Sequence, residues 1–267
     1  MKKFGIYTMM LVLMLIIAAC GTEEADSSKE SSGESSGESS GDTKETYIVG
    51  IDTTYPPFEF EVDGEYTGID IDLITAIAEN QGIEIEFDAM DFGGIIPAMQ
   101  ADQLDIAIAG MSITDDRKKI VDFSEPYFEA GLSLVVDAKT TDIKSIEDLE
   151  GKTIAAKNGT TGAAFAQENE AEHGYTLVLF DDSPAMFQEV SNGNADALIE
   201  DYPVIAYAIS QNNLELQIVG ERLNGDHYGI AVLKGKNVDV LQKINDGLKD
   251  LRDSGEYDEI ISKYLDE

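Results

Sequence analysis

The chain has 267 residues, of which 43% are hydrophobic and 27% charged, a composition that fits one large globular domain or two modest ones. Its 53 acidic residues against 18 basic ones give a formal net charge of −35, and so negative a surface repels nucleic acid and anionic lipid. We therefore exclude both as ligands. The single cysteine, Cys20, leaves no intramolecular disulfide and no cysteine-based metal site.

The first 45 residues differ from the rest of the chain. Lys2 and Lys3 precede an apolar run at 9–17, which predicts a secretory signal peptide over 1–19. Small residues lead into Cys20, and this arrangement resembles the lipobox of bacterial lipoproteins, whose cysteine is lipidated and anchors the protein outside the cell membrane. The alternative is an ordinary signal peptide with a chance cysteine. Residues 20–45 lack large apolar side chains, so we predict an acidic Ser/Gly/Glu tether behind the lipidated cysteine.

From residue 46 onward, short apolar strands alternate with helical patterns. The first round predicts a βαβαβ unit, with strands at 47–51, 83–87 and 104–109 and helices at 70–80 and 94–101, the first helix capped by Asp70. A second round predicts strands at 131–136, 153–156, 176–180 and 195–199 and helices at 162–170, 184–192 and 204–211. The tail predicts a strand at 228–233 and helices at 238–252 and 257–265. The alternation is typical of mainly parallel sheets flanked by helices.

Two α/β units of similar size predict two lobes. If the tail returns to the first unit, lobe 1 comprises residues 46–130 and 226–267, and lobe 2 comprises 131–225. Two chain crossings between the lobes would then form a hinge. The two histidines of the chain, His173 and His227, belong to no motif, so we expect them at the surface or in the hinge.

A candidate ligand site follows the predicted strand at 104–109. Crevices at strand carboxyl ends are where open α/β sheets hold ligands. Arg117 is one of three arginines in this acidic chain, and its guanidinium could pair with a carboxylate through two hydrogen bonds while Ser112 adds a third. The alternative is that Arg117 caps a helix or pairs with Asp115 or Asp116.

Several ordered motifs over about 220 residues resemble the extracellular solute-binding proteins of polar amino-acid ABC transporters (family 3), most closely the glutamine-binding proteins. They are DTTYPPFEF at 52–60, GIDIDL at 68–73, MDFGGIIPA at 90–98, AGMSITDDRKK at 109–119, DFSEPY at 122–127, KNGTTG at 157–162 and ED at 200–201. The resemblance implies an α/β fold of the two-lobed type II periplasmic-binding-protein class, each lobe a mainly parallel sheet flanked by helices. It also implies a monomer without cofactor or metal, which delivers a free L-amino acid to a membrane permease and its ATPase.

The resemblance assigns the groups that hold the amino-acid backbone. Arg117, the Ser112 hydroxyl and the N–H of Thr161 would bind the ligand α-carboxylate, and the start of a helix suits an anion. Asp201, with the Gly110 carbonyl and Ser112, would bind the α-ammonium. The alternative for Asp201 is the N-cap of the following helix.

The resemblance also assigns the groups that select the ligand side chain. Asp52 and Lys157 would flank a side-chain amide, between aromatic walls formed by Tyr55 and Phe92, and Glu200 would add a negative charge at the pocket rim. An amide satisfies a carboxylate and an ammonium together, which favours glutamine over glutamate. Glu200 favours arginine or histidine instead, whereas Lys157 opposes a cationic tail.

Two other functions share this pattern. A few secreted cyclohexadienyl dehydratases have the same fold, so Asp52, Lys157 and Glu200 could in principle perform acid–base chemistry. A sensory role would need a separate partner, because the chain carries no signalling domain. A tethered lipoprotein with an amino-acid pocket argues for capture rather than catalysis.

Overall fold

A computed structural model of the chain describes residues 46–212 and 214–265. The predicted signal peptide, lipidated Cys20 and acidic tether lie outside these residues. Among the described helices, none combines the length and apolar composition that a membrane-spanning segment needs.

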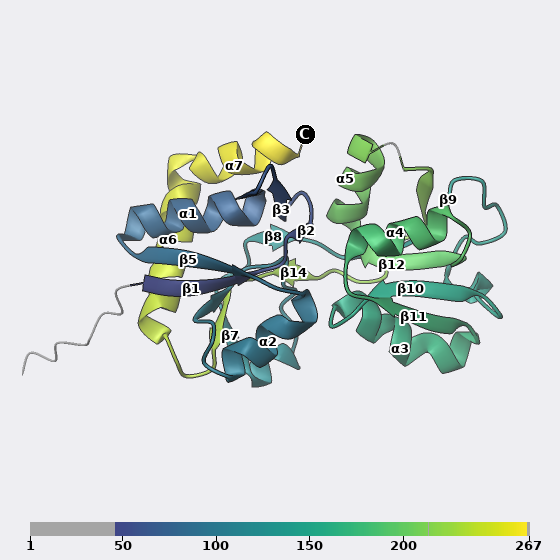
Figure 1. Cartoon of the computed structure of the whole chain (residues 1–267), viewed down its shortest axis with the longest axis horizontal. Helices are drawn as coiled ribbons and strands as arrows, with labels where there is room; N and C mark the ends of the chain where they lie inside the picture. The colour runs from purple at the N-terminus through teal and green to yellow at the C-terminus, as the bar shows by residue number, and fades with distance from the viewer. Residues whose placement is uncertain (1–45, 213, 266–267) are drawn as a thin grey trace, which may run out of the picture. The chain divides into compact units, whose positions relative to one another are not determined.

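The first lobe is built on a five-stranded sheet with the order β5-β1-β6-β15-β7, in which β1 runs parallel to β5 and β6, and β15 runs antiparallel to β6 and β7. Its strands are β1 (Thr46–Ile51), β5 (Glu84–Ala89), β6 (Ile106–Ala107), β7 (Val121–Phe123) and β15 (Ala231–Leu233). Its helices are α1 (Ile69–Gln81), α2 (Phe92–Gln100), α6 (Val238–Ser254) and α7 (Glu256–Tyr264). Figure 1 shows α1 and α7 on one side of the sheet and α2 on the other. Ile106 and Ile108 pack in the cluster with α1, while Ala107 and Ala109 face α2, as alternation along a strand requires.

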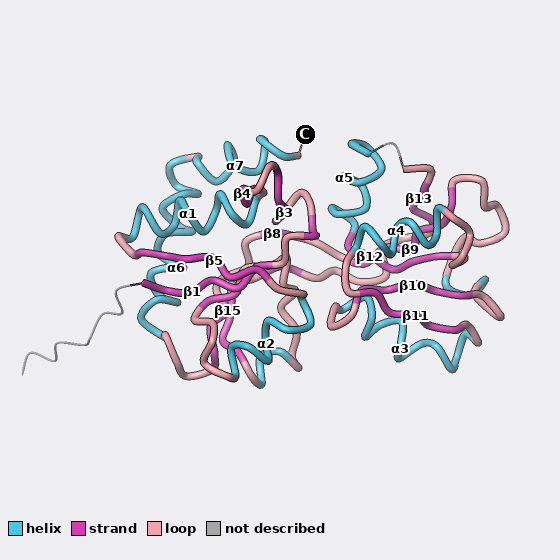
Figure 2. The backbone as a smooth tube through the Cα atoms, viewed as in Figure 1, coloured by secondary structure: helices cyan, strands magenta, loops and turns pink. Residues whose placement is uncertain are grey.

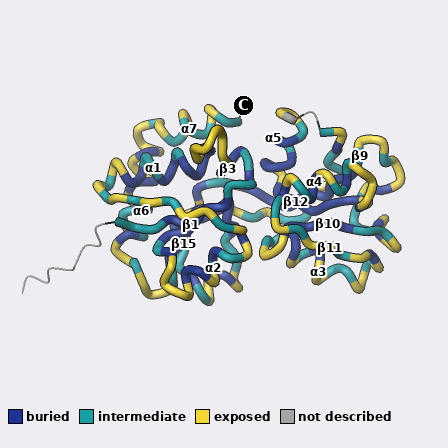
Figure 3. Tube along the Cα trace, in the orientation of Figure 1, coloured by how far each residue is buried: buried dark blue, intermediate teal, exposed yellow. Residues whose placement is uncertain are grey.

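The second lobe has a sheet with the order β11-β10-β12-β9-β13, parallel at one edge and antiparallel at β9 and β13. Its strands are β9 (Leu132–Asp137), β10 (Thr153–Lys157), β11 (Thr176–Phe180), β12 (Ala197–Asp201) and β13 (Leu216–Val219). Its helices are α3 (Thr161–His173), α4 (Ser183–Ser191) and α5 (Tyr202–Asn212). The central strands are buried on both faces, and Figures 2 and 3 show them beneath helices whose outer faces are exposed.

Short polar side chains cap two helices, each within one residue of its predicted start. The Thr160 hydroxyl accepts a hydrogen bond from the N–H of Ala163 at the start of α3, and the Asp182 carboxylate does the same for Ala185 at α4. Gly82 ends α1 in the left-handed conformation with φ 62°, which glycine adopts without steric cost.

The expectation that Asp70 caps α1 is wrong. The helix begins at Ile69, and its N-cap residue is Gly68, which has no side chain to form a cap. The Asp70 carboxylate is fully buried, where its Oδ2 accepts hydrogen bonds from the N–H of Gly110 and the hydroxyl of Tyr127. Asp72 instead bonds Lys263 and Tyr264 of helix α7.

The structure adds short elements that the sequence patterns did not predict. They are the strands β2 (Thr54–Tyr55), β3 (Glu59–Val62), β4 (Glu65–Thr67), β7, β8 (Phe128–Glu129) and β13, the 3₁₀ turns η1 (Arg117–Lys119) and η2 (Ile146–Asp148), and β14 (His227–Tyr228), which replaces the start of the strand expected at 228–233. Strands β8 and β14 pair where the chain passes between the two sheets. His227 lies on this pair, and His173 lies in the last turn of α3.

Candidate functional site

Eight of the ten predicted ligand contacts line one cavity with an empty volume of about 250 Å³. Its walls come from β2, the start of α2, the segment from the end of β6 to η1, the end of β10 with the start of α3, and the end of β12, so they combine both lobes. The two predicted contacts that do not line the cavity are Asp52 and Glu200, which bond residues that do. Ala109 and Thr160 complete the lining.

Arg117 is 9% exposed and directs its guanidinium into this cavity. Its Nη1 donates to the carbonyl of Ser112 (2.8 Å) and its Nη2 to the carbonyl of Gly159 in the other lobe (3.1 Å). The guanidinium carbon lies 5.1 Å from the ring centre of Phe92. These contacts hold the guanidinium plane in place, and within residues 46–212 and 214–265 the other three of its five N–H groups have no acceptor.

The acidic neighbours of Arg117 are paired elsewhere, contrary to the alternative that one of them neutralises it. Lys118 Nζ lies 3.9 Å from Asp115, and Lys119 Nζ lies 2.5 Å from Asp116. All four side chains are more than half exposed, so they form solvent-facing pairs outside the cavity. The buried guanidinium is therefore free of a carboxylate partner from its own turn.

The start of helix α3 faces Arg117 across the cavity. Thr161 is the first residue of this helix, and the first four N–H groups of any helix have no partner within it. The positive end of the helix dipole and the guanidinium together favour an anion between them. The hydroxyls of Ser112 and Thr161 approach each other from the two lobes at 3.5 Å.

Asp201 lies at the end of β12 with its two oxygens in different environments. Oδ2 accepts hydrogen bonds from the hydroxyls of Tyr55 (2.6 Å) and Tyr228 (2.5 Å). Oδ1 is buried and has no hydrogen-bond donor among the described residues, so it does not cap α5. Burial raises the pKa of Asp201, against the lowering effect of the two tyrosine bonds. An unpartnered buried carboxylate oxygen is suited to a cation.

Gly110 forms the turn between these charged groups. Its φ is +52°, and a Cβ atom built there would lie 2.6 Å from Cε1 of Tyr55, so a side chain is excluded. The ring of Tyr228 closes the other side of the turn. The sequence analysis identified Gly110 through its carbonyl, and the structure shows that its N–H is bonded to the buried Asp70.

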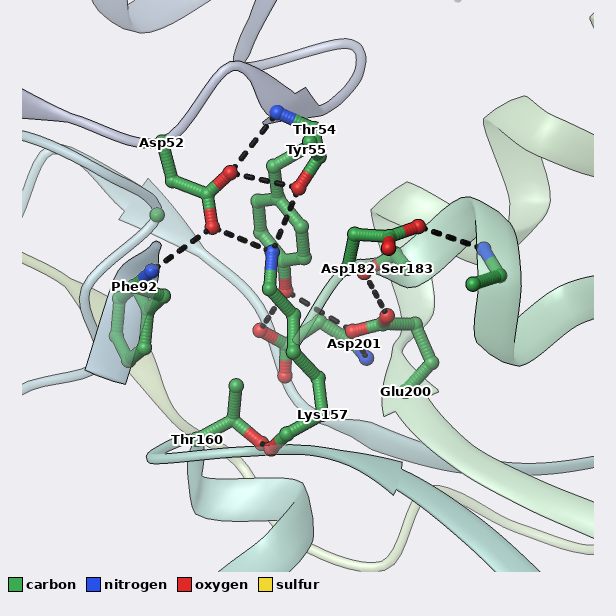
Figure 4. A network of polar contacts seen from close by, with 12 residues as sticks. Asp52, Thr54, Tyr55, Phe92, Lys157, Thr160, Asp182, Ser183, Glu200 and Asp201 are labelled. Carbon is green, nitrogen blue, oxygen red and sulfur yellow. Dashed lines mark hydrogen bonds and ion pairs between the residues drawn. The ribbon is translucent and has the colours of Figure 1, made fainter. Parts of the chain in front are cut away.

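Asp52 and Lys157 form an ion pair with each other rather than standing apart (Figure 4). Lys157 Nζ lies 2.6 Å from Asp52 Oδ2, and the two side chains are 2% and 3% exposed. The Thr54 hydroxyl donates to Asp52 Oδ1 (2.6 Å) and accepts from Lys157 (3.1 Å). The ammonium also lies 4.9 Å from the ring centre of Tyr55. This cluster joins the two lobes and carries no net charge.

Glu200 is buried at 3% exposure instead of lying at the pocket rim. Its Oε1 accepts from the Tyr55 hydroxyl (3.0 Å) and the N–H of Asp201 (2.8 Å), and its Oε2 accepts from the Ser183 hydroxyl (2.8 Å). Burial, followed by the charge of Asp201, raises the pKa of Glu200 to about 7. The Glu200 carboxyl therefore lies behind Tyr55, whose single hydroxyl proton is shared between Asp201 at 2.6 Å and Glu200 at 3.0 Å.

The sequence analysis missed four residues that hold this site together: Tyr228, Thr54, Ser183 and Thr160. Thr54 and Thr160 lie inside recognised motifs, and their spacing from Asp52 and Lys157 could have identified them. Tyr228 and Ser183 are distant in sequence from the residues they bond, so no local pattern indicates them.

The chain matches known proteins over nearly its whole length. The family profile of bacterial extracellular solute-binding proteins, family 3, matches residues 47–267. The chain is 34% identical to the ABC transporter glutamine-binding protein GlnH of Bacillus subtilis (strain 168), covering 100% of this chain and 98% of GlnH. It is 32% identical to the arginine-binding extracellular protein ArtP of the same organism, covering 99% and 98%.

Solved structures agree with this relationship. An ancestral arginine-binding protein bound to arginine superposes with a TM-score of 0.78 at 44% identity, over 83% of this chain and 99% of that one. An ancestral arginine-binding protein bound to glutamine gives the same TM-score and identity over 84% and 100%. The predicted two-lobed type II periplasmic-binding-protein fold is thus confirmed, and these relatives are named for binding an amino acid rather than for a reaction. The chain belongs to the bacterial extracellular solute-binding proteins of family 3.

Proposed function

We propose that the protein captures one free L-amino acid between its lobes, L-glutamine in preference to others, and delivers it to an ABC permease that an ATPase drives. The backbone of the ligand would use the unpaired groups of the cavity. Its α-carboxylate would lie between Arg117, Ser112 and the Thr161 N–H. Its α-ammonium would lie at Asp201 Oδ1 and the Gly110 carbonyl, because Asp201 Oδ1 is buried and receives no donor from the residues that the structure describes.

The observation that carries the preference for glutamine is the buried ion pair of Asp52 and Lys157. A side-chain amide has two N–H donors and a carbonyl acceptor, so it can bond the carboxylate and the ammonium at once. A second ligand carboxylate would compete with Asp52 for the ammonium of Lys157, and a guanidinium would be repelled by that ammonium. The aromatic rings of Tyr55 and Phe92 line the cavity and would pack on the ligand's methylene groups.

L-Arginine is the second candidate ligand. Glu200 adds a further carboxyl behind Tyr55, and one structural relative is an ancestral arginine-binding protein bound to arginine while another is an ancestral arginine-binding protein bound to glutamine. Relatives named for glutamine and for arginine match this chain at similar sequence identity, so identity does not distinguish the two ligands. The preference for glutamine therefore rests on the residues around Lys157.

Isothermal titration of the purified protein, freed of co-purifying ligand, tests this proposal. Glutamine, arginine, histidine and glutamate are compared, and prephenate and arogenate are added with an assay for aromatic product. We expect saturable binding of glutamine with the highest affinity of the series. Tighter binding of arginine would contradict the Lys157 argument, and formation of aromatic product would replace capture by catalysis.

We further propose that the protein acts as a monomer outside the cell membrane, anchored through a lipid on Cys20. The lipobox-like sequence before Cys20 supports the anchor. A Cys20→Ser variant should leave the membrane fraction and should not incorporate labelled palmitate. Unchanged membrane association would contradict the anchor, and light scattering of the purified protein checks its mass.

A further inference from the structure

Two carboxyl groups lie buried in lobe 1 behind the ligand cavity. Glu59 on β3 and Asp70 in the first turn of α1 are both 0% exposed. The N–H groups of Ile69 and Asp70 bond the carbonyls of Pro57 (2.9 Å) and Phe58 (2.8 Å), so the start of the helix lies directly against the strand. Three of their four carboxyl oxygens, both of Glu59 and Oδ1 of Asp70, are buried without a hydrogen-bond partner among the described residues.

Such a pair of neighbouring buried carboxyls is stable only with a proton on one of the two groups. A carboxylate only accepts hydrogen bonds, and no group of the described residues donates to either oxygen of Glu59 or to Asp70 Oδ1. Of the other charged groups that face Glu59, Asp52 opposes its ionisation, and the Lys157 cation is already paired with Asp52. Two adjacent buried carboxyls without a cation of their own do not both ionise.

The hydrogen-bond partners decide which group holds the proton. Asp70 Oδ2 accepts from the N–H of Gly110 (2.8 Å) and from the hydroxyl of Tyr127 (2.9 Å), and both donors stabilise its anion. Burial raises the pKa of Asp70 to about 6, against these two bonds. Glu59 has no such donor, and burial, followed by the charges of Asp70 and Asp52, raises its pKa well above the usual range. The proton therefore lies on Glu59.

The Asp70 carboxylate in turn holds the turn that lines the cavity. Gly110 adopts a φ of +52° between the rings of Tyr55 and Tyr228, and its peptide N–H has Asp70 as its acceptor. Tyr127, the second donor, precedes the hinge strand β8. A single negative charge at Asp70 thus fixes the peptide plane of Gly110, and it connects that plane to the hinge.

We propose that Glu59 and Asp70 form a buried acid pair with one shared proton, held by Glu59, and that Asp70 is a positioning residue that orients the Gly110 turn for ligand binding. The positioning role rests on the proposed amino-acid site. The shared proton does not, so the two parts are tested separately.

Infrared difference spectroscopy tests the proton. Spectra of the ligand-free protein and of Glu59→Gln are compared at about pH 8, above the pKa of about 7 of Glu200. We expect the protein to show the carbonyl band of a protonated carboxyl, and we expect Glu59→Gln to lack it. A spectrum without that band, or a band that persists in Glu59→Gln, would overturn the acid pair whichever ligand the protein binds.

Titration calorimetry with the amino acid that the unaltered protein binds tests the positioning role. Glu59→Gln keeps a neutral donor beside Asp70, so its affinity should stay within about threefold. Asp70→Ala leaves Gly110 and Tyr127 without an acceptor, so its affinity should fall about tenfold or more. The matched control is Asp72→Ala, two residues along the same helix, whose partners lie on α7.

The outcomes separate the two proposals. If the unaltered protein binds no amino acid, the proposed function fails while the infrared result still decides the acid pair. If Asp70→Ala binds as tightly as Asp72→Ala, Asp70 has no positioning role. If Asp70→Ala does not fold, the affinity of Glu59→Gln is the deciding measurement. A loss of affinity of about tenfold in Glu59→Gln would contradict the proposal that Asp70 needs only a neutral donor beside it.

Discussion

The two ends of the cavity hold their charges differently. At one end, Asp201 Oδ1 has no donor among the described residues, and the two bonds of the Arg117 guanidinium go to backbone carbonyls. At the other end, Asp52 and Lys157 are paired at 2.6 Å. The first end is organised for charges that the protein itself does not supply, and the second is already neutral. Binding of the amino-acid backbone and choice of its side chain are therefore expected to depend on separate groups.

The largest effect is expected where a charge lacks a partner. Arg117→Ala and Asp201→Ala should each weaken ligand binding by about thirtyfold or more, because truncating one member of a buried charge pair costs about 2–5 kcal/mol. Calorimetry measures the affinity, and circular dichroism checks the fold. Lys118→Ala, in the same turn but more than half exposed, is the control. Micromolar binding by a folded Arg117→Ala or Asp201→Ala variant would contradict the proposal that this end of the cavity binds the ligand's α-carboxylate and α-ammonium.

The neutral end is broken by Lys157→Met. Losing the ammonium leaves the buried Asp52 carboxylate without its cation, which should lower the free energy of unfolding by about 3–5 kcal/mol. Glutamine affinity should fall about tenfold and arginine affinity should rise, because a guanidinium can replace the lost cation. Thermal unfolding with and without each ligand measures both effects. Lys152→Met serves as the control, because Lys152 directly precedes β10 and its side chain is more exposed than that of Lys157. An unchanged order of ligand preference in Lys157→Met would contradict the role of Lys157.

The tyrosine hydroxyls sharpen the comparison because they orient Asp201 without carrying charge. Tyr228→Phe and Tyr55→Phe each remove one of two bonds to Oδ2, so each should weaken binding by about 1–2 kcal/mol, or roughly fivefold to thirtyfold. The double variant should lose more than either single one. Tyr66→Phe, whose side chain is exposed on the hairpin of β3 and β4, should bind normally. Equal affinities across the series would show that Asp201 needs no orientation.

The smallest effect concerns pH. In the folded protein the pKa of Glu200 is about 7, above its ordinary value of 4.5, so the folded state binds more protons than the unfolded state between these values. Stability is therefore lost as the pH rises through that window. Between about pH 6 and pH 8, Glu200 accounts for a fall of roughly 1 kcal/mol, which Glu200→Gln should remove. Urea unfolding of the ligand-free protein at both pH values measures the slope, and an equal slope in the variant would contradict the assignment.

Much of the fold was predictable because its signals are local. The two α/β rounds and the tail helices follow from the spacing of apolar residues. The hairpin of β2, β3 and β4 was missed because strands of two to four residues are too short for a repeating pattern. The strand expected at 104–109 is only two residues long in the structure, Ile106–Ala107. Backbone hydrogen bonds to neighbouring strands define a strand, and hydrophobic residues alone do not.

The sequence by itself determined the family, the two-lobed α/β class and the motifs that supply the cavity residues, because these depend on residue types at fixed spacing. The tertiary structure alone decided how those residues are paired. It joined Asp52 to Lys157, buried Glu200 behind Tyr55, and turned Asp70 from an expected helix cap into the acceptor for Gly110. Each of these contacts joins residues 40 to 145 positions apart, where hydrogen-bond geometry and burial act between elements that no local pattern relates.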